Sequence, residues 1–269
     1  MEQGMSDGLP SALDQQDVIA SRLQNRSVAL FLDYDGTLTP IVQRPEDAIL
    51  SAEMRDIVRG VATCCPVAIV SGRDRRTVEQ LVDVKALAYV GSHGFDIVGA
   101  PGSGIRREVA SEYLPTLDAA EAALRARLAD VEGALVERKK FTEAIHFRLV
   151  APALRKRVED AVDAVHAEQP TLRKEGGKAV FELRPDLHWD KGTAVLWLLE
   201  KMGLDHALPI HIGDDLTDET VFGALGDGGI GIVVTDERRP TAAQFTLRDP
   251  GDVARFLSGL TRMLSGEPR

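Results

Sequence analysis

The chain has little cysteine, few aromatic residues and no long apolar run. Its two cysteines, Cys64 and Cys65, are adjacent, so they are poorly placed to pair with each other and have no third partner. This favours a reducing compartment, and we expect a cytoplasmic protein. No apolar stretch approaches the length of a membrane span, and Met1–Gln16 lacks the basic start and apolar centre of a signal peptide.

Basic residues are fewer than acidic ones. The formal net charge of the 269 residues is −10, which argues against a nucleic-acid surface because phosphate backbones are met by basic patches. An acidic protein can still bind a phosphorylated small molecule if a metal ion and a few lysines reverse the field locally. The length allows one large core domain with a smaller second one.

Apolar strand-like runs alternate with helical segments in two parts of the chain, which predicts βαβ units and a Rossmann-like parallel sheet. The predicted strands of this α/β core are 30–32, 66–70, 87–90, 208–212 and 230–234. Between them the order changes to helix 114–128, strands 135–139 and 144–150, helix 152–168, and strands near 172 and at 179–183. We therefore predict a core domain formed by 1–102 and 185–269, with a smaller α+β domain inserted at 103–184.

Two aspartates follow the first predicted strand. In Val28–Thr37, Asp33 and Asp35 come directly after a run typical of a buried parallel strand, and Gly36 lets the chain turn. Two acids crowded at one strand end repel each other unless a cation lies between them. A turn or helix cap is the alternative use of such aspartates. An EF-hand fits less well, because it needs a preceding helix and an acid or amide at position 37.

A second acidic group follows the strand at 208–212. The segment 213–219 carries four acids, namely Asp214, Asp215, Asp218 and Glu219. Helix capping accounts for one or two of them but not for four. Carboxylates from two strand ends therefore indicate a divalent cation, and hard oxygen ligands favour Mg²⁺ over zinc.

Other polar residues lie where phosphate chemistry needs them. Ser71 ends the second strand and offers a hydroxyl for a phosphoryl oxygen, while Gly72 permits close backbone approach. Lys191, at a predicted helix start, would balance phosphoryl charge, although a lone lysine is usually solvated. Gly226–Gly231 matches the dinucleotide fingerprint G-x-G-x-x-G but precedes a strand, so we reject it.

Together these motifs resemble the haloacid dehalogenase (HAD) superfamily of phosphotransferases. The string DYDGT is similar to its first motif, Ser71 to its second, Lys191 to its third and GDDLTDE to its fourth. The match follows the core domain in order, and the inserted domain resembles the α/β cap of some branches. The second Asp argues against a dehalogenase, which has no alkoxide leaving group to protonate.

Further strings resemble the trehalose-6-phosphate phosphatase family. They are Ser71–Arg73, Gly91–Gly94, Glu137–Lys139, His146–Arg148, Lys178–Pro185, Asp190–Gly192 and Gly213–Glu219. The resemblance implies that the cap grips the sugar through Lys139, Arg148, Lys178 and Glu182, and that Gly72, Arg73, His93 and Gly94 also bind substrate. The family usually has a longer acid where this chain has Asp96, so the role of that residue stays open.

The resemblance further implies hydrolysis of trehalose 6-phosphate through an aspartyl-phosphate on Asp33, with Asp35 as general acid and base. Ser71 and Lys191 would orient the phosphoryl oxygens. The implied Mg²⁺ ligands are Asp33, the main-chain carbonyl of Asp35, and Asp214, with Asp215 and Asp218 nearby or acting through water. The alternatives are a phosphatase for sucrose phosphate or mannosylglycerate phosphate, and a non-catalytic binding module of the same fold. We expect a small sugar phosphate as partner, no nucleic acid and no membrane; the sequence leaves the oligomeric state open, with a monomer as the simplest expectation.

Overall fold

The computed structural model describes residues 8–42, 44–177 and 179–266. Lys178 of the expected sugar-binding set lies outside the described residues, as does the beginning of the polar N-terminal segment. The chain divides into two compact units. The core unit takes in the chain up to Arg107 and again from Trp189 onward, and the inserted unit is Glu108–His188.

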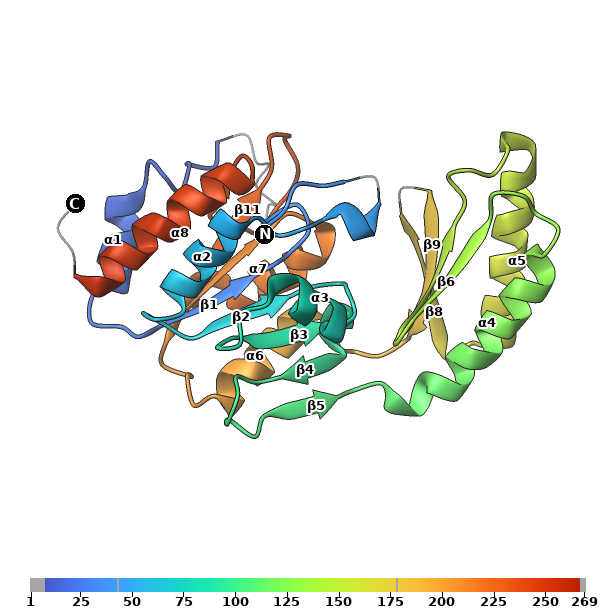
Figure 1. Cartoon of the computed structure of the whole chain (residues 1–269), viewed down its shortest axis with the longest axis horizontal. Helices are drawn as coiled ribbons and strands as arrows, with labels where there is room; N and C mark the ends of the chain where they lie inside the picture. The colour runs from blue at the N-terminus through green and yellow to red at the C-terminus, as the bar shows by residue number, and fades with distance from the viewer. Residues whose placement is uncertain (1–7, 43, 178, 267–269) are drawn as a thin grey trace. The chain divides into compact units, whose positions relative to one another are not determined.

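An eight-stranded sheet forms the centre of the core unit (Figure 1). Its strands are β1 (Val28–Leu32), β2 (Val67–Val70), β3 (Ala88–Gly91), β4 (Asp96–Val98), β5 (Arg106–Glu108), β10 (Leu208–Gly213), β11 (Ile230–Val234) and β12 (Phe245–Leu247). Their order is β12-β11-β10-β1-β2-β3-β4-β5. The pairs from β12 to β3 are parallel, and β4 is antiparallel to β3.

Helices cover both faces of this sheet. They are α1 (Gln16–Leu23), α2 (Ala52–Val61), α3 (Arg75–Val82), α6 (Lys191–Lys201), α7 (Glu219–Leu225) and α8 (Pro250–Ser265). Successive residues of β1 point to opposite faces, so Leu30 and Leu32 pack in one apolar cluster with residues of α1, α2, α3 and α8. Ala29 and Phe31 pack in the other cluster, with α6 and α7. All five β1 residues are buried, as expected for a parallel strand covered on both sides.

The α/β fold predicted for the core is confirmed, but the sheet has more strands at one edge than the sequence indicates. Strands β4 and β5 continue the sheet beyond β3. For this reason the core unit extends to Arg107, whereas the predicted boundary was 103, and it resumes at Trp189 instead of 185. Both strands have only three residues, too few for a clear alternating pattern.

The inserted unit is an antiparallel sheet in the order β6-β7-β9-β8. Its elements are α4 (Leu114–Leu128), β6 (Leu135–Lys139), β7 (Thr142–His146), α5 (Arg155–Glu168), β8 (Leu172–Gly177) and β9 (Val180–Pro185). Val136 and Ile145, which point to one side of the sheet, share an apolar cluster with Leu117 of α4 and Val162 of α5. The opposite side of this sheet carries polar side chains.

Strand β7 is shorter than predicted. The expected strand 144–150 ends at His146, because the Phe147 N–H donates to the carbonyl of Ala179 and the Val150 N–H closes a turn on the carbonyl of Phe147. Arg148 therefore lies exposed in a turn and does not alternate with His146 along a strand. Both cysteines are free thiols. Within the described ranges, no helix has the length and apolar character needed to cross a membrane.

Candidate active site

Strand register brings the predicted motifs to one edge of the sheet. Leu32, the last residue of β1, pairs with Ile69 of β2 on one side and with Ile212 of β10 on the other. The segments that follow these three strands therefore leave the sheet at the same level, at the carboxyl edge where open α/β sheets bind ligands. Asp33 and Asp214 enter the site from two of these segments.

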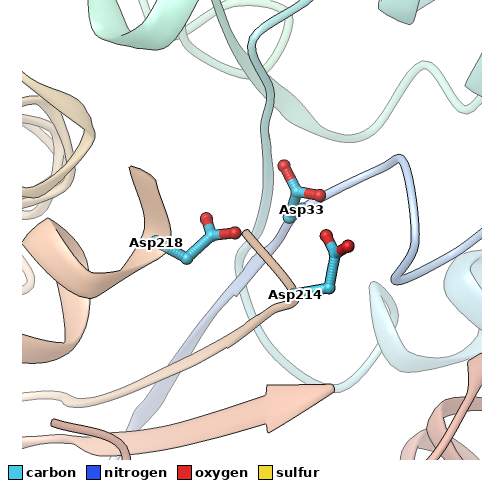
Figure 2. A group of neighbouring side chains, drawn as sticks. All are labelled: Asp33, Asp214 and Asp218. Carbon is cyan, nitrogen blue, oxygen red and sulfur yellow. The ribbon is translucent and has the colours of Figure 1, made fainter. Parts of the chain in front are cut away.

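Three aspartates form a cluster there. Asp33 and Asp218 are buried and Asp214 is half-buried, and carboxylate oxygens of the three lie within 4.8 Å of one another. Figure 2 shows the side chains directed into a common space, with Asp33 after β1 and the other two in the segment after β10. Such a set of hard oxygen donors fits a divalent cation.

Lys191 holds two of the three aspartates. Its Nζ lies 2.8 Å from Asp33 Oδ1 and 2.9 Å from Asp218 Oδ1, and its side chain is only 2% exposed. The preceding residue, Asp190, caps helix α6 by accepting a 2.8 Å hydrogen bond from the Thr193 N–H. The cap fixes the first turn of the helix, and so the point from which Lys191 reaches the site.

Burial and charge shift the pKa values of these groups in opposite directions. Burial raises the pKa of Asp33 well above its usual range, although Lys191 opposes the shift. Burial, with Asp218 and Asp215 nearby, also raises the pKa of Asp214, to about 7. Burial acts on Asp218 in the same direction, but Lys191 and His211 outweigh it and lower the pKa of that carboxyl. A divalent cation would favour the ionised forms of Asp33 and Asp214, so these donors fit such an ion.

Gly36 is required by the close approach of two loops. It has a φ of +75°, and a Cβ at this position would lie 2.1 Å from Asp214 Oδ2. Any other residue would both strain the backbone and displace the Asp214 carboxylate. The glycine of the first motif thus places the segment after β1 against the acid that follows β10.

Asp35 is paired with Arg73 and not with Lys191. Its carboxylate accepts two hydrogen bonds from the Arg73 guanidinium, 2.6 Å from Nε and 2.7 Å from an Nη atom. Arg73 also donates to the carbonyl of Pro45 and lies over the ring of Tyr34. Arg73 was expected to bind substrate, and the structure places it on Asp35.

Ser71 and Gly72 meet the loop that carries His93. Ser71 is buried, and its main-chain carbonyl accepts a 3.1 Å hydrogen bond from the His93 N–H. A Cβ on Gly72 would lie 2.5 Å from the His93 ring, so the glycine allows the two segments to pack. The structure therefore brings three of the residues expected to bind phosphate or substrate into contact.

The acids after β10 differ in the groups from which they accept hydrogen bonds. Asp215 is exposed and accepts hydrogen bonds from the Leu216 N–H and the Thr217 hydroxyl. Asp218 Oδ2 accepts from the Asp215 N–H, while its Oδ1 faces Lys191. Glu219 accepts from the Ala242 N–H. Two of the four acids thus stabilise the local turn, as the capping alternative expects, and Asp214 remains directed at Asp33.

In the inserted unit, Lys139 and Glu182 lie together. Their Nζ and Oε1 atoms are 3.5 Å apart. Glu182 on β9 pairs with Ala144 of β7, which pairs in turn with Glu137 of β6, so the two glutamates share the polar side of the sheet. His146 is on the same side, 2.8 Å from Glu137. This side presents both donors and acceptors, as a polyhydroxyl ligand requires.

Comparison with known proteins agrees with this geometry. The family model described as trehalose-phosphatase matches residues 31–251. The chain belongs to the trehalose-phosphatase family. The protein named probable trehalose-phosphate phosphatase D of Arabidopsis thaliana is 40% identical over 264 residues, which cover 93% of this chain and 72% of that protein. Trehalose 6-phosphate phosphatase RA3 of Zea mays is 40% identical over 268 residues, 93% of this chain and 74% of the relative.

Solved structures of this family share the fold. The C-terminal domain of Candida albicans trehalose-6-phosphate phosphatase aligns with a TM-score of 0.76 at 24% identity, over 97% of this chain and 99% of that one. The Aspergillus fumigatus trehalose-6-phosphate phosphatase aligns with a TM-score of 0.67 at 27% identity, over 95% and 99%. The predicted resemblance to the family is confirmed.

Sequence reasoning missed one polar residue behind the site. His211 is fully buried in β10, with Nε2 3.0 Å from Asp218 Oδ1 and Nδ1 3.2 Å from the carbonyl of Phe31. It thus links the aspartate that faces Lys191 to strand β1. The signal was a single histidine within the apolar run Leu208–Ile212.

The structure also shows the surroundings of Asp96, the position at which this chain differs from the usual family pattern. This residue is buried, and its Oδ1 lies 3.1 Å from Nε of Arg75, a buried arginine at the start of α3. The pair connects the first turn of α3 to strand β4.

Proposed function

We propose that this chain is a Mg²⁺-dependent phosphatase that hydrolyses trehalose 6-phosphate to trehalose and phosphate. The observation that carries the proposal is the convergence of Asp33, Asp214 and Lys191 at one sheet edge, in a member of the trehalose-phosphatase family. A buried carboxylate held by an ammonium group, beside a second carboxylate, is suited to binding and attacking a phosphoryl group.

Asp33 is the nucleophile in this mechanism. Lys191 orients its carboxylate through Oδ1, and an oxygen of Asp33 forms a bond to phosphorus while the bond from phosphorus to the sugar oxygen breaks. Lys191 and Ser71 balance and orient the phosphoryl oxygens. Water then attacks phosphorus and releases phosphate, which regenerates the Asp33 carboxylate.

Asp35 moves the protons. It gives a proton to the departing sugar oxygen and later takes one from the attacking water. In the structure its carboxylate is held by Arg73. Asp35 must therefore exchange at least one of these hydrogen bonds for the leaving group, and Arg73 acts on substrate through Asp35.

The residues suited to hold Mg²⁺ are Asp33, Asp214 and the main-chain carbonyl of Asp35. Both carboxylate oxygens of Asp215 and of Asp218 already accept hydrogen bonds from neighbouring groups, so these two acids orient the segment and Lys191 and would contact the ion only through water. When bound, the cation would supply positive charge that offsets the charge of the phosphoryl group and of the two acids. The inserted unit would bind the disaccharide through Lys139, Glu182 and Arg148, which makes it the specificity domain.

The experiment is a phosphate-release assay on a panel of sugar phosphates, with and without EDTA. We expect the highest kcat/KM for trehalose 6-phosphate, loss of turnover in EDTA and recovery with Mg²⁺. A preference for sucrose phosphate or mannosylglycerate phosphate would contradict the proposed substrate but not the proposed phosphatase mechanism. Full turnover in excess EDTA would refute the metal assignment, and no turnover of any phosphate would favour the binding-module alternative.

A further inference from the structure

The loop Ser92–Gly94 has an unusual backbone. Its three residues have consecutive positive φ angles of 51°, 56° and 105°. Ser92 and His93 carry side chains, for which the left-handed region is unfavourable. Such a conformation persists only where surrounding contacts fix it, and it is found disproportionately at functional sites.

On one side the loop fixes the phosphate-binding segment after β2. The Ser92 N–H donates to the carbonyl of Arg73 at 2.7 Å, and the His93 N–H donates to the carbonyl of Ser71 at 3.1 Å. Gly72 lies against the His93 ring. The left-handed loop therefore sets the backbone course of the segment 71–73.

On the other side the loop is held by a tryptophan. Trp189 donates its indole N–H to the carbonyl of Gly94 at 2.8 Å. The main chain next to it is also close, since a Cβ on Gly94 would lie 2.8 Å from the carbonyl oxygen of Asp190. The same segment continues directly into Lys191, so one indole connects the loop to the start of α6.

Trp189 also marks the place where the chain re-enters the core unit. Arg107, the last residue of the first core segment, stacks its guanidinium 4.7 Å from the Trp189 ring and 5.2 Å from the ring of Trp197 on α6. These are the two tryptophans of the chain. Both tryptophans contact Arg107 and pack against the same apolar cluster. Trp189 in addition donates its indole N–H to the loop Ser92–Gly94.

We propose that Trp189 is a positioning residue for phosphoryl transfer. Through its hydrogen bond to Gly94 it holds the left-handed loop, and through the loop it fixes Ser71 and His93. The proposal rests on the proposed function of this site. Trp189 is assigned no contact with substrate, so its removal should weaken all phosphoryl chemistry equally and leave sugar selectivity unchanged.

Trp189→Phe tests the hydrogen bond, because phenylalanine keeps an aromatic face for Arg107 but lacks the N–H donor. Trp197→Phe is the matched control, since it changes the other tryptophan beside the same arginine. We expect Trp189→Phe to lower kcat/KM about tenfold for trehalose 6-phosphate and for a small aryl phosphate, and Trp197→Phe to stay within about twofold of wild type. Equal activities of the two variants, or a loss confined to trehalose 6-phosphate, would overturn the proposal.

Each variant also leaves a single tryptophan, which gives a second readout that does not depend on turnover. Addition of Mg²⁺ and beryllium fluoride, a phosphoryl analogue, should change the emission of Trp189 in Trp197→Phe and leave that of Trp197 in Trp189→Phe unchanged. An unchanged Trp189 emission, or equal changes at both positions, would contradict the coupling. Failure of the proposed function shows differently, as a wild-type protein that hydrolyses neither phosphate.

Discussion

At the residue scale, the two aspartates of the first motif have different surroundings. Asp33 is buried against Lys191, whereas Asp35 is partly exposed and paired with Arg73. Burial of Asp33 raises its pKa, and the ammonium of Lys191 opposes that shift. The two acids are therefore suited to different tasks, one as an oriented nucleophile and the other as a proton carrier that can move.

The first prediction separates these tasks. Asp33→Asn should abolish turnover and covalent labelling by a phosphoryl analogue, because the amide is no nucleophile. Asp35→Asn should slow turnover by roughly 10²–10⁴-fold, the usual contribution of general acid–base catalysis, and should still bind beryllium fluoride. The measurements are kcat for trehalose 6-phosphate and analogue binding by calorimetry. Near wild-type turnover of Asp33→Asn would mean that another residue attacks phosphorus.

The sequence predicted that the motif residues lie at strand ends, but not which side chains they contact. Asp33, Asp35 and Asp214 stand beside strands whose apolar runs are plain in the sequence. The pairing of Arg73 with Asp35, and of His211 with Asp218, joins residues 38 and 7 positions apart. Such contacts depend on strand order and loop course, which no local pattern specifies.

At the scale of elements, helix α6 has its stabilising N-cap directly beside a residue of the candidate site. Asp190 caps the helix through the Thr193 N–H, and Lys191 is the first helical residue. Helix α8 has the same kind of cap, because Asp249 accepts a 2.8 Å hydrogen bond from the Asp252 N–H. The two caps differ in that only the one on α6 precedes a residue of the site.

The second prediction uses this pair of caps. Asp190→Ala and Asp249→Ala should each lower the free energy of unfolding by about 1 kcal/mol, the usual cost of removing an N-cap. Only Asp190→Ala should also lower kcat, because the first turn of α6 then positions Lys191 less well. Denaturant unfolding and steady-state kinetics on both variants provide the comparison. Similar kcat values for the two would show that the α6 cap has no part in positioning Lys191.

The hairpin of β6 and β7 holds a buried carboxylate. Glu143 is fully buried, and its Oε1 lies 2.8 Å from Nε of Arg138, its neighbour across the hairpin. Burial raises the pKa of Glu143 to about 8, although Arg138 opposes the shift. The folded protein therefore binds this proton more tightly than the unfolded chain does.

The third prediction is a pH dependence from this group. Its contribution to stability is complete below the unfolded-state pKa of about 4.5 and is lost as the pH rises through about 8. Between pH 5 and pH 9 the wild-type protein should lose about 4 kcal/mol of stability that Glu143→Gln does not lose. Glu159→Gln on α5, whose side chain is 43% exposed, serves as control. Parallel stability curves for wild type and Glu143→Gln would refute the assignment.

Long elements gave clearer signals than short ones. Helix α4 and strand β6 match their predicted bounds, and helix α5 begins three residues later than predicted. Strands β4, β5 and β12 have three residues each, and neither they nor helix α1 gave a usable signal. Their structure follows from the sheet edge or the apolar surface on which they lie.

At the scale of the whole molecule, the acidic composition does not oppose a phosphate substrate. The net charge is −10, yet the site places Lys191 between two of its acids and Arg73 on a third. Local cations, together with the divalent ion of the proposed function, would determine the field that an anion meets, and the surplus of acids elsewhere contributes little through solvent. Composition argues against a nucleic-acid partner but does not indicate which phosphorylated molecule is the substrate.

Under the proposed function, the division into two units would separate phosphoryl chemistry from sugar recognition. The core unit holds every residue proposed for phosphoryl transfer, and the inserted unit presents Lys139 and Glu182, 3.5 Å apart, on the polar side of its sheet. A site built to hydrogen-bond hydroxyl groups also rejects substrates that lack them, because its polar atoms are then left unpaired. Changes in the inserted unit should therefore affect one substrate class and spare the other.

The fourth prediction tests this separation with Glu182→Gln, which keeps the size of the side chain and removes its charge. We expect kcat/KM for trehalose 6-phosphate to fall by about 10- to 100-fold, the effect of losing a charge-assisted hydrogen bond of about 1.5–3 kcal/mol. Hydrolysis of a small aryl phosphate should stay within about twofold, because that substrate has no sugar for the inserted unit to bind. Glu159→Gln, in the same unit but on a helix surface, should change neither. Equal losses on both substrates would assign Glu182 to the folding of the inserted unit, and an unchanged preference for trehalose 6-phosphate would remove it from the sugar site.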